Sequence, residues 1–221
     1  MHIKHIFNSV LLSYSKVVQN LFIDVKHNGG EKEYMKTNKI IWAKTMLFAY
    51  KYLEAMCNSI DKIIGSIATG SFYHGGAWDD SKNCYNISRK IIRLSDKKID
   101  YINLKVIIEK ALNNIDKTYA KILILRNIKE LSVATICSLL NFSERTFFRK
   151  INLAERSFMC EIEKLGFNIY NLEIKYLCDE FIRSIYNIFS EEKTTYENVA
   201  NRSFNSNIIF NYLRDFARFT I

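Results

Sequence analysis

Apolar residues recur at intervals of three and four along most of the chain, which is the spacing of one face of an α-helix. In the first segment this face consists of Ile3, Phe7, Val10, Tyr14, Val17 and Leu21. Gly29 and Gly30 follow, and glycine readily takes the left-handed conformation that ends helices. The pattern therefore predicts a first helix that ends near residues 27–30 and packs on the rest of the protein.

A second, longer helical pattern runs from about residue 36 to residue 68. Its apolar positions are Ile40, Ile41, Met46, Leu47, Tyr50, Leu53, Met56, Cys57, Ile60, Ile63 and Ile64. Because consecutive helices joined by a short turn usually lie side by side, we expect an amino-terminal helical hairpin within residues 1–69.

The segment 70–85, GSFYHGGAWDDSKNCY, interrupts the helical pattern. It holds three of the seven glycines and two aspartates, and both residue types favour turns. A phosphate-binding loop is the alternative, but no strand precedes the glycines and no Gly-Lys-Ser/Thr sequence follows them. We therefore predict a linker.

Helical spacing resumes after the linker, where basic residues outnumber acidic ones. The basic residues are Arg89, Lys90, Arg93, Lys97, Lys98 and Lys105. The apolar positions are Ile87, Ile91, Leu94, Ile99, Ile102, Val106, Ile107, Ala111 and Ile115. Ser95 and Asp96 have side chains that can cap a helix, so we expect a new helix to begin there.

Residues 116–166 predict three further helices, each with a capping side chain at its start. Asp116 caps the first, whose inward residues are Tyr119, Ile122, Leu123 and Leu125. Ser132 caps the second, which ends at Leu140. Its inward residues are Val133, Ile136, Leu139 and Leu140, and the small Cys137 lies where the second and third helices cross.

Asn141 stands where a tight turn between two helices requires a left-handed residue, and asparagine is the best choice after glycine. Phe142 is expected to enter the core, and Ser143 to cap the third helix. The inward face of that helix consists of Phe147, Ile151, Ala154, Phe158, Ile162 and Leu165. Its first turns present Glu144, Arg145, Thr146, Arg149 and Lys150 outward.

The order LSVATICSLLNFSERTFFRKINLAERSF resembles region 4 of bacterial sigma factors and related phage-type late-gene regulators. In that family an apolar residue and serine open one helix, an Ile-Ala pair lies inside it, Gly-Ile-Ser forms the turn and Thr-Val begins the recognition helix. The matching positions are Leu131-Ser132, Ile136-Cys137, Asn141-Phe142-Ser143 and Thr146-Phe147, with Arg126 and Ala154 at the family's arginine and alanine. The departures are Glu130, where glycine is common, and Asn141, which replaces the turn glycine.

The resemblance covers about a quarter of the chain and implies a helix-turn-helix that binds double-stranded DNA. The third helix would enter the major groove. The residues expected to contact bases are Glu144, Arg145, Thr146 and Arg149. The residues expected to contact phosphates are Lys129, Ser132, Ser143, Lys150 and Arg156. A purely structural helical bundle is the alternative, and the turn residues and the cations on the third helix argue against it.

Composition agrees with an all-α, DNA-binding protein. The 221 residues include no proline and only seven glycines, so few positions oppose a helix. The formal net charge of +9 favours a polyanionic partner, because basic side chains near phosphates release condensed counterions.

Cysteine, histidine and hydropathy patterns point away from enzymes, metal sites and membranes. The five cysteines are odd in number and include no CxxC pair, which predicts reduced thiols in a cytoplasmic protein without a metal or another cofactor. The four histidines, His2, His5, His27 and His74, are scattered and have no catalytic context. No stretch reaches the roughly 18 apolar residues of a membrane span.

Two amphipathic helices are predicted in the carboxy-terminal region, NLEIKYLCDEFIRSIYNIF and SNIIFNYLRDFARF. They would pack on the amino-terminal hairpin or on a second subunit, which would make the protein a homodimer. We therefore expect an all-α protein with an amino-terminal helical region (1–69), a linker (70–85), a DNA-binding region (86–166, core 116–166) and a helical carboxy-terminal tail (167–221).

The predicted function is sequence-specific DNA binding in transcription regulation, in a bacterial or phage protein. A diverged sigma factor that binds core RNA polymerase is one alternative. A non-enzymatic helical interaction protein is another.

Overall fold

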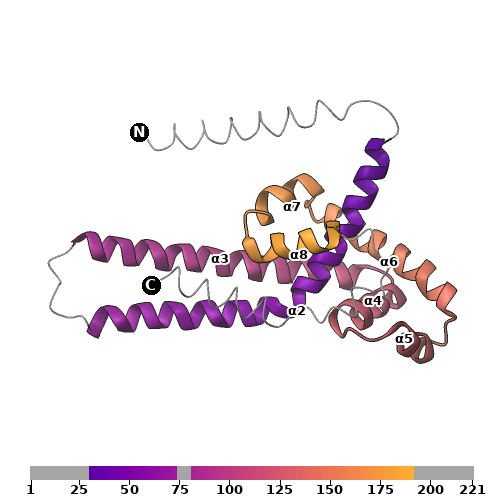
Figure 1. The fold of residues 1–221 in the computed structure, drawn as a ribbon, viewed down its shortest axis with the longest axis horizontal. Helices are drawn as coiled ribbons and strands as arrows, with labels where there is room; N and C mark the ends of the chain where they lie inside the picture. The colour runs from indigo at the N-terminus through magenta and orange to yellow at the C-terminus, as the bar shows by residue number, and fades with distance from the viewer. Residues whose placement is uncertain (1–29, 74–80, 192–221) are drawn as a thin grey trace. The chain divides into compact units, whose positions relative to one another are not determined.

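The computed structural model describes residues 30–73 and 81–191, in which all regular elements are helices (Figure 1). The all-α prediction is confirmed for this part of the chain. The helices are α2 (Gly30–Tyr73), α3 (Ser81–Asn114), α4 (Lys117–Leu123), the short π-helix η1 (Ile124–Ile128), α5 (Val133–Leu140), α6 (Glu144–Lys164), α7 (Ile169–Tyr176) and α8 (Glu180–Glu191). None of these helices combines the length and apolar character that crossing a membrane requires.

The chain divides after Asn38 into two compact units, residues 1–38 and 39–221. The predicted first helix, the hairpin that it would form and the amphipathic segment 206–219 involve residues outside the described ranges. Helices from Lys39 onward belong to the second unit.

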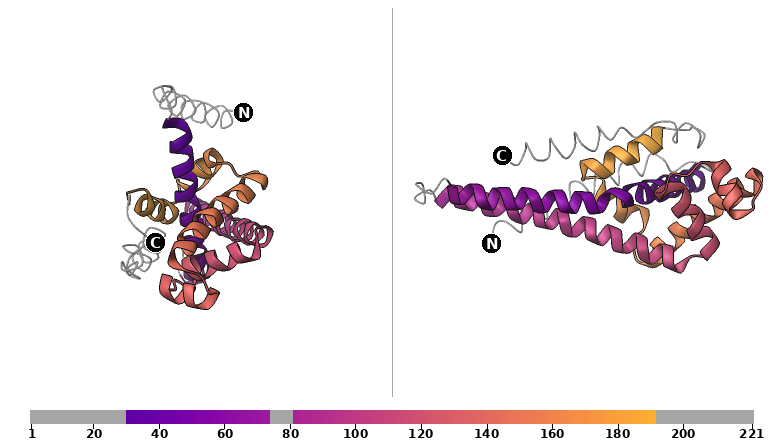
Figure 2. Two further views of the ribbon diagram at one scale, coloured as in Figure 1. Left: turned by 90° about the vertical axis from the view of Figure 1, so that its right-hand side faces the viewer. Right: turned by 90° about the horizontal axis from the view of Figure 1, so that it is seen from below.

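Helices α2 and α3 form a long antiparallel pair, which runs side by side in both views (Figures 1 and 2). Three polar contacts cross it: Tyr50 OH donates to Glu109 at 2.8 Å, and the ion pairs Lys105–Glu54 and Lys98–Asp61 measure 3.2 and 2.6 Å. From one contact to the next the residue number rises in α2 and falls in α3, as an antiparallel arrangement requires. Burial, together with Glu109, raises the pKa of Tyr50 to about 12.

Helices extend into the segment 70–85 that was predicted as a linker, because α2 continues to Tyr73 and α3 begins at Ser81. Residues 74–80 between them lie outside the described ranges. The predicted break at Ser95 and Asp96 is wrong, because α3 is continuous through both residues. Leu94 and Tyr101 on either side are buried in the same core, so packing outweighs the local capping signal.

Helix α8 packs on both members of the antiparallel pair. The Phe181 ring lies 6.3 Å from that of Tyr52 in α2 and 6.4 Å from that of Tyr101 in α3, and the Trp42 and Tyr186 rings are 5.1 Å apart. The continuous helix predicted over residues 171–189 is instead two helices, because α7 ends at Tyr176 and α8 begins at Glu180.

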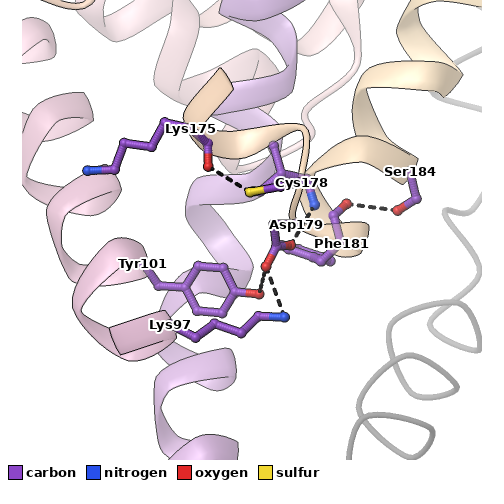
Figure 3. Close-up of polar contacts among 8 residues, drawn as sticks. Lys97, Tyr101, Lys175, Cys178, Asp179, Phe181 and Ser184 are labelled. Carbon is purple, nitrogen blue, oxygen red and sulfur yellow. Dashed lines mark hydrogen bonds and ion pairs between the residues drawn. The ribbon is translucent and has the colours of Figure 1, made fainter. Parts of the chain in front are cut away.

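Asp179 both starts α8 and ties it to α3 (Figure 3). Its carboxylate accepts hydrogen bonds from the Ile182 backbone amide at 3.1 Å and from Tyr101 OH at 2.8 Å, and it pairs with Lys97 Nζ at 3.0 Å. The Asp179 side chain is only 12% exposed, so these contacts are largely shielded from water. A single carboxylate thus provides the cap of one helix and the link to another.

Replacing Asp179 by alanine should lower the free energy of unfolding by about 2–4 kcal/mol, because it removes a helix cap and the acceptor of two partly buried donors. Urea unfolding measured by circular dichroism checks this. Asp61→Ala is the matched control, since it removes a half-exposed partner of Lys98 and should cost about 1 kcal/mol or less. Equal losses in the two variants would contradict the role given to Asp179.

Candidate nucleic-acid interface

Helix α4 begins as predicted, with Asp116 as its cap. The Asp116 carboxylate accepts hydrogen bonds from the backbone amides of Thr118 at 2.8 Å and Tyr119 at 3.3 Å. The Thr118 amide is the main cause of the lowered pKa of this exposed carboxylate. Ile122, Leu123 and Leu125 are buried as expected, and Tyr119 is half-buried.

The connection from η1 to α5 contains a left-handed residue, Glu130, with φ of 53°. Its neighbours are fixed by two hydrogen bonds, from the Leu131 amide to the Leu125 carbonyl at 3.0 Å and from Arg126 Nη1 to the Leu131 carbonyl at 3.1 Å. Glu130 occupies the position at which the sigma-like pattern commonly has glycine, and that pattern was the available signal for a positive φ. Its carboxylate pairs with Lys51 of α2 at 2.6 Å.

The α5–α6 turn has the predicted capping residues. Ser132 Oγ accepts from the Thr135 amide at 3.2 Å, and Ser143 Oγ accepts from the Thr146 amide at 3.3 Å. Asn141 is left-handed, with φ of 53° and ψ of 45°. The turn residues that orient α6 relative to α5 were therefore predicted correctly.

Two side chains near this turn lie differently from the prediction. Leu139 was expected to face inward but is 58% exposed. Residues 133, 136, 137 and 140 share about a third of the helix circumference, and Leu139 falls outside that sector. Phe142 is half-buried, and Lys150 Nζ lies 4.2 Å from its ring centroid.

Cys137 on α5 is buried, in agreement with its expected place between the helices. Burial and, to a smaller extent, the Glu144 carboxylate raise the pKa of its thiol. The thiol is therefore neutral near pH 7 and acts as a small core side chain. Within the described residues, no three His, Cys, Asp or Glu side chains gather where they could hold a metal ion.

The inward face of α6 is completely buried and fixes the opposite face toward solvent. Phe147, Ile151, Ala154, Phe158 and Ile162 are each 0% exposed, as predicted, and Leu165 packs against the same core. The exposed residues on the other side include Glu144, Arg145, Phe148, Arg149, Asn152 and Arg156, and also Leu153 and Cys160. We call the first six of these residues the outer face of α6.

Its three arginines, Arg145, Arg149 and Arg156, are available to an external partner. None of the seven ion pairs in the described part of the chain involves any of them. Arg145 and Arg149 are four residues apart, which places them one helical turn apart on the same face.

The other candidate residues divide into exposed and engaged side chains. Lys129, Ser132 and Ser143 are exposed around the start of α5 and α6. Thr146 and Lys150 are half-buried: Thr146 Oγ1 lies 2.9 Å from Ser143 Oγ, and Lys150 covers the Phe142 ring. These two side chains therefore brace the turn.

Phe148 and Asn152 belong to the outer face but were not among the predicted contact residues. Phe148 was overlooked because it follows the inward-facing Phe147, although its position three residues after Arg145 puts it on the outward side. Asn152 lies seven residues after Arg145, which is the same side two turns later.

The left-handed turn at Asn141 should tolerate glycine better than alanine. We expect Asn141→Ala to lower the free energy of unfolding by about 1 kcal/mol, because alanine has a Cβ that disfavours the left-handed conformation and no polar side chain to offset that cost. Asn141→Gly should change the free energy of unfolding by less than about 0.5 kcal/mol, because glycine adopts this conformation without strain. Thermal and urea unfolding measure both, with Ser138→Ala on exposed α5 surface as control. An alanine variant as stable as the glycine variant would contradict the strained turn.

Comparison with known proteins identifies no relative of this chain. No protein-family model matches it, and no curated protein or solved structure is similar to it at a significant level.

Proposed function

We propose that this chain is a cytoplasmic, non-enzymatic transcription regulator that binds double-stranded DNA sequence-specifically, with α6 in the major groove. The observation that carries the proposal is the outer face of α6. It presents Arg145 and Arg149, exposed and free of ion pairs, on a helix whose opposite face is completely buried.

The dimensions and side chains of α6 suit the groove. A helix with its side chains is about 10–12 Å wide, and the major groove is about 12 Å wide. Arginine makes bidentate hydrogen bonds to the O6 and N7 of guanine, so Arg145 and Arg149 are the candidates for reading G·C pairs. Glu144 can accept from the cytosine amino group.

Phe148 and Asn152 extend this assignment to A·T pairs. An exposed phenylalanine can contact the thymine methyl group, and asparagine can bond to the N6 and N7 of adenine. Both side chains lie on the same face as the arginines. The proposed target therefore contains both G·C and A·T pairs.

Residues at the helix starts and one cation further along α6 would hold the phosphates. Lys129 is an exposed cation before α5, and Arg156 is the last cation of the outer face. Ser132 and Ser143 stand at the starts of α5 and α6, where free amides and the helix dipole favour anions. Thr146 and Lys150 support the turn, and the Lys150 charge adds to the positive field there.

Two ion pairs link α2 to the segment that carries α5 and α6. Lys51 pairs with Glu130 before α5, and Lys39 pairs with Glu163 near the end of α6 at 2.7 Å. These contacts connect both ends of the helix-turn-helix to one long helix. In the proposal, this attachment holds α6 in place when it meets DNA.

Selection of bound sequences from random duplex DNA, with and without core RNA polymerase, tests the proposed function. A regulator should enrich a G-containing motif without polymerase. A diverged sigma factor would instead enrich a motif only when polymerase is present. If neither condition enriches a motif, the proposal is wrong and a structural helical bundle is favoured.

Arg145→Ala should weaken binding to the selected site by about 1–3 kcal/mol and should relax the preference for one base pair. Binding to unrelated DNA should change much less, because a base contact contributes little there. Fluorescence anisotropy with selected and scrambled duplexes measures both affinities. An equal loss on the two duplexes would refute the base-reading role of Arg145.

Lys129→Ala is the matched substitution for a phosphate contact. It should weaken binding to both duplexes alike and reduce the slope of log affinity against log salt concentration by about one unit. Titrations over a series of salt concentrations give this slope. An unchanged slope would show that Lys129 does not neutralise a phosphate.

A further inference from the structure

Helix α3 carries a row of large apolar side chains on its solvent side. Tyr85, Ile92, Ile99 and Val106 follow one another at intervals of seven residues, and Ile102 lies beside them. Their exposed fractions range from 65% for Tyr85 to 39% for Val106. We call these five residues the α3 seam.

The α3 seam is distinct from the side of α3 that packs against α2. That packed side contains the buried Leu94, Tyr101 and Ile108 and the ion-paired Lys98 and Lys105. Helix α2 has no comparable seam, since no large apolar side chain among its described residues is exposed. The exposed apolar row is therefore a property of α3 and not of the whole antiparallel pair.

A spacing of seven is the repeat of helices that wind around a partner. On an isolated straight helix, positions seven residues apart drift by about 20° per repeat, whereas winding around another helix keeps them facing it. From Tyr85 to Val106 the seam is about 32 Å long at 1.5 Å per residue, which is three such repeats. The seam thus supplies one apolar core position in every repeat, and Ile102 supplies the second in one of them, over a length that suits contact between two helices.

The charges beside the seam favour a second copy of the same helix. Arg89 and Asp96 are exposed, make none of the seven ion pairs in the described residues, and stand three residues before and four residues after Ile92. When two copies run antiparallel about a twofold axis between Ile92 and Arg93, Arg89 of each lies level with Asp96 of the other. A parallel pair would place each residue level with its own copy and would give no such match.

We propose that the chain forms an antiparallel homodimer through the α3 seam, with Ile92 beside the twofold axis and two Arg89–Asp96 ion pairs across it. The contact is self-complementary, as a twofold interface must be. In this register Tyr85 of one copy packs near Ile99 of the other. The dimer does not depend on DNA binding.

Sedimentation of the full chain over a range of concentrations tests the dimer. The wild type should reach twice its chain mass of 26.0 kDa. Ile92→Asp should raise the dissociation constant by more than about a hundredfold, because the substitution occurs twice beside the axis and each lost isoleucine contact weakens binding about tenfold or more. Ile174→Asp, at a 55% exposed position on α7, is the matched control and should leave the dimer intact.

Charge reversal tests the antiparallel register. Arg89→Asp should weaken the dimer, and Arg89→Asp combined with Asp96→Arg should restore it. Circular dichroism verifies that each variant remains folded. The proposal would be overturned if the wild type stays monomeric. It would also be overturned if the dimer survives Ile92→Asp and is lost on deletion of residues 192–221. A double variant that fails to restore the dimer would overturn the register.

Discussion

The complete burial of one side of α6 is the constraint on which the proposed interface depends. Phe147, Ile151 and Phe158 have no exposed surface, so α6 cannot rotate without exposing large apolar side chains. The residues on the opposite side are therefore held outward, among them Arg145 and Arg149. Buried side chains that would make no contact with DNA therefore determine the orientation of the surface that would contact it.

Two left-handed residues determine how α6 is presented. Asn141 closes the turn between α5 and α6, and Glu130 turns the chain before α5, each with φ of 53°. Asparagine tolerates this conformation well, whereas glutamate has no such preference. Lys51 of α2 pairs with the Glu130 carboxylate at 2.6 Å. Glu130, which is less suited than asparagine to a positive φ, therefore also connects the helix-turn-helix to the α2–α3 pair.

Local sequence signals predicted the caps and turns of α4, α5 and α6, whereas the pairing of α2 with α3 depends on long-range packing that they do not specify. The caps at Asp116, Ser132 and Ser143 act within three residues along the chain, so the sequence indicates them directly. The α2–α3 pairing joins residues more than thirty positions apart, and no local pattern specifies it. For the same reason the continuity of α3 depends on neighbours that periodicity does not identify.

Dimethyl sulfate footprinting on the selected site would show whether α6 reads DNA from the major groove. This reagent methylates guanine N7 in the major groove and adenine N3 in the minor groove, so one experiment reports on both grooves. We predict that the protein protects guanine N7 atoms and that Arg145→Ala removes protection at one guanine. Protection of adenine N3 alone, with every guanine N7 still reactive, would show that α6 does not lie in the major groove.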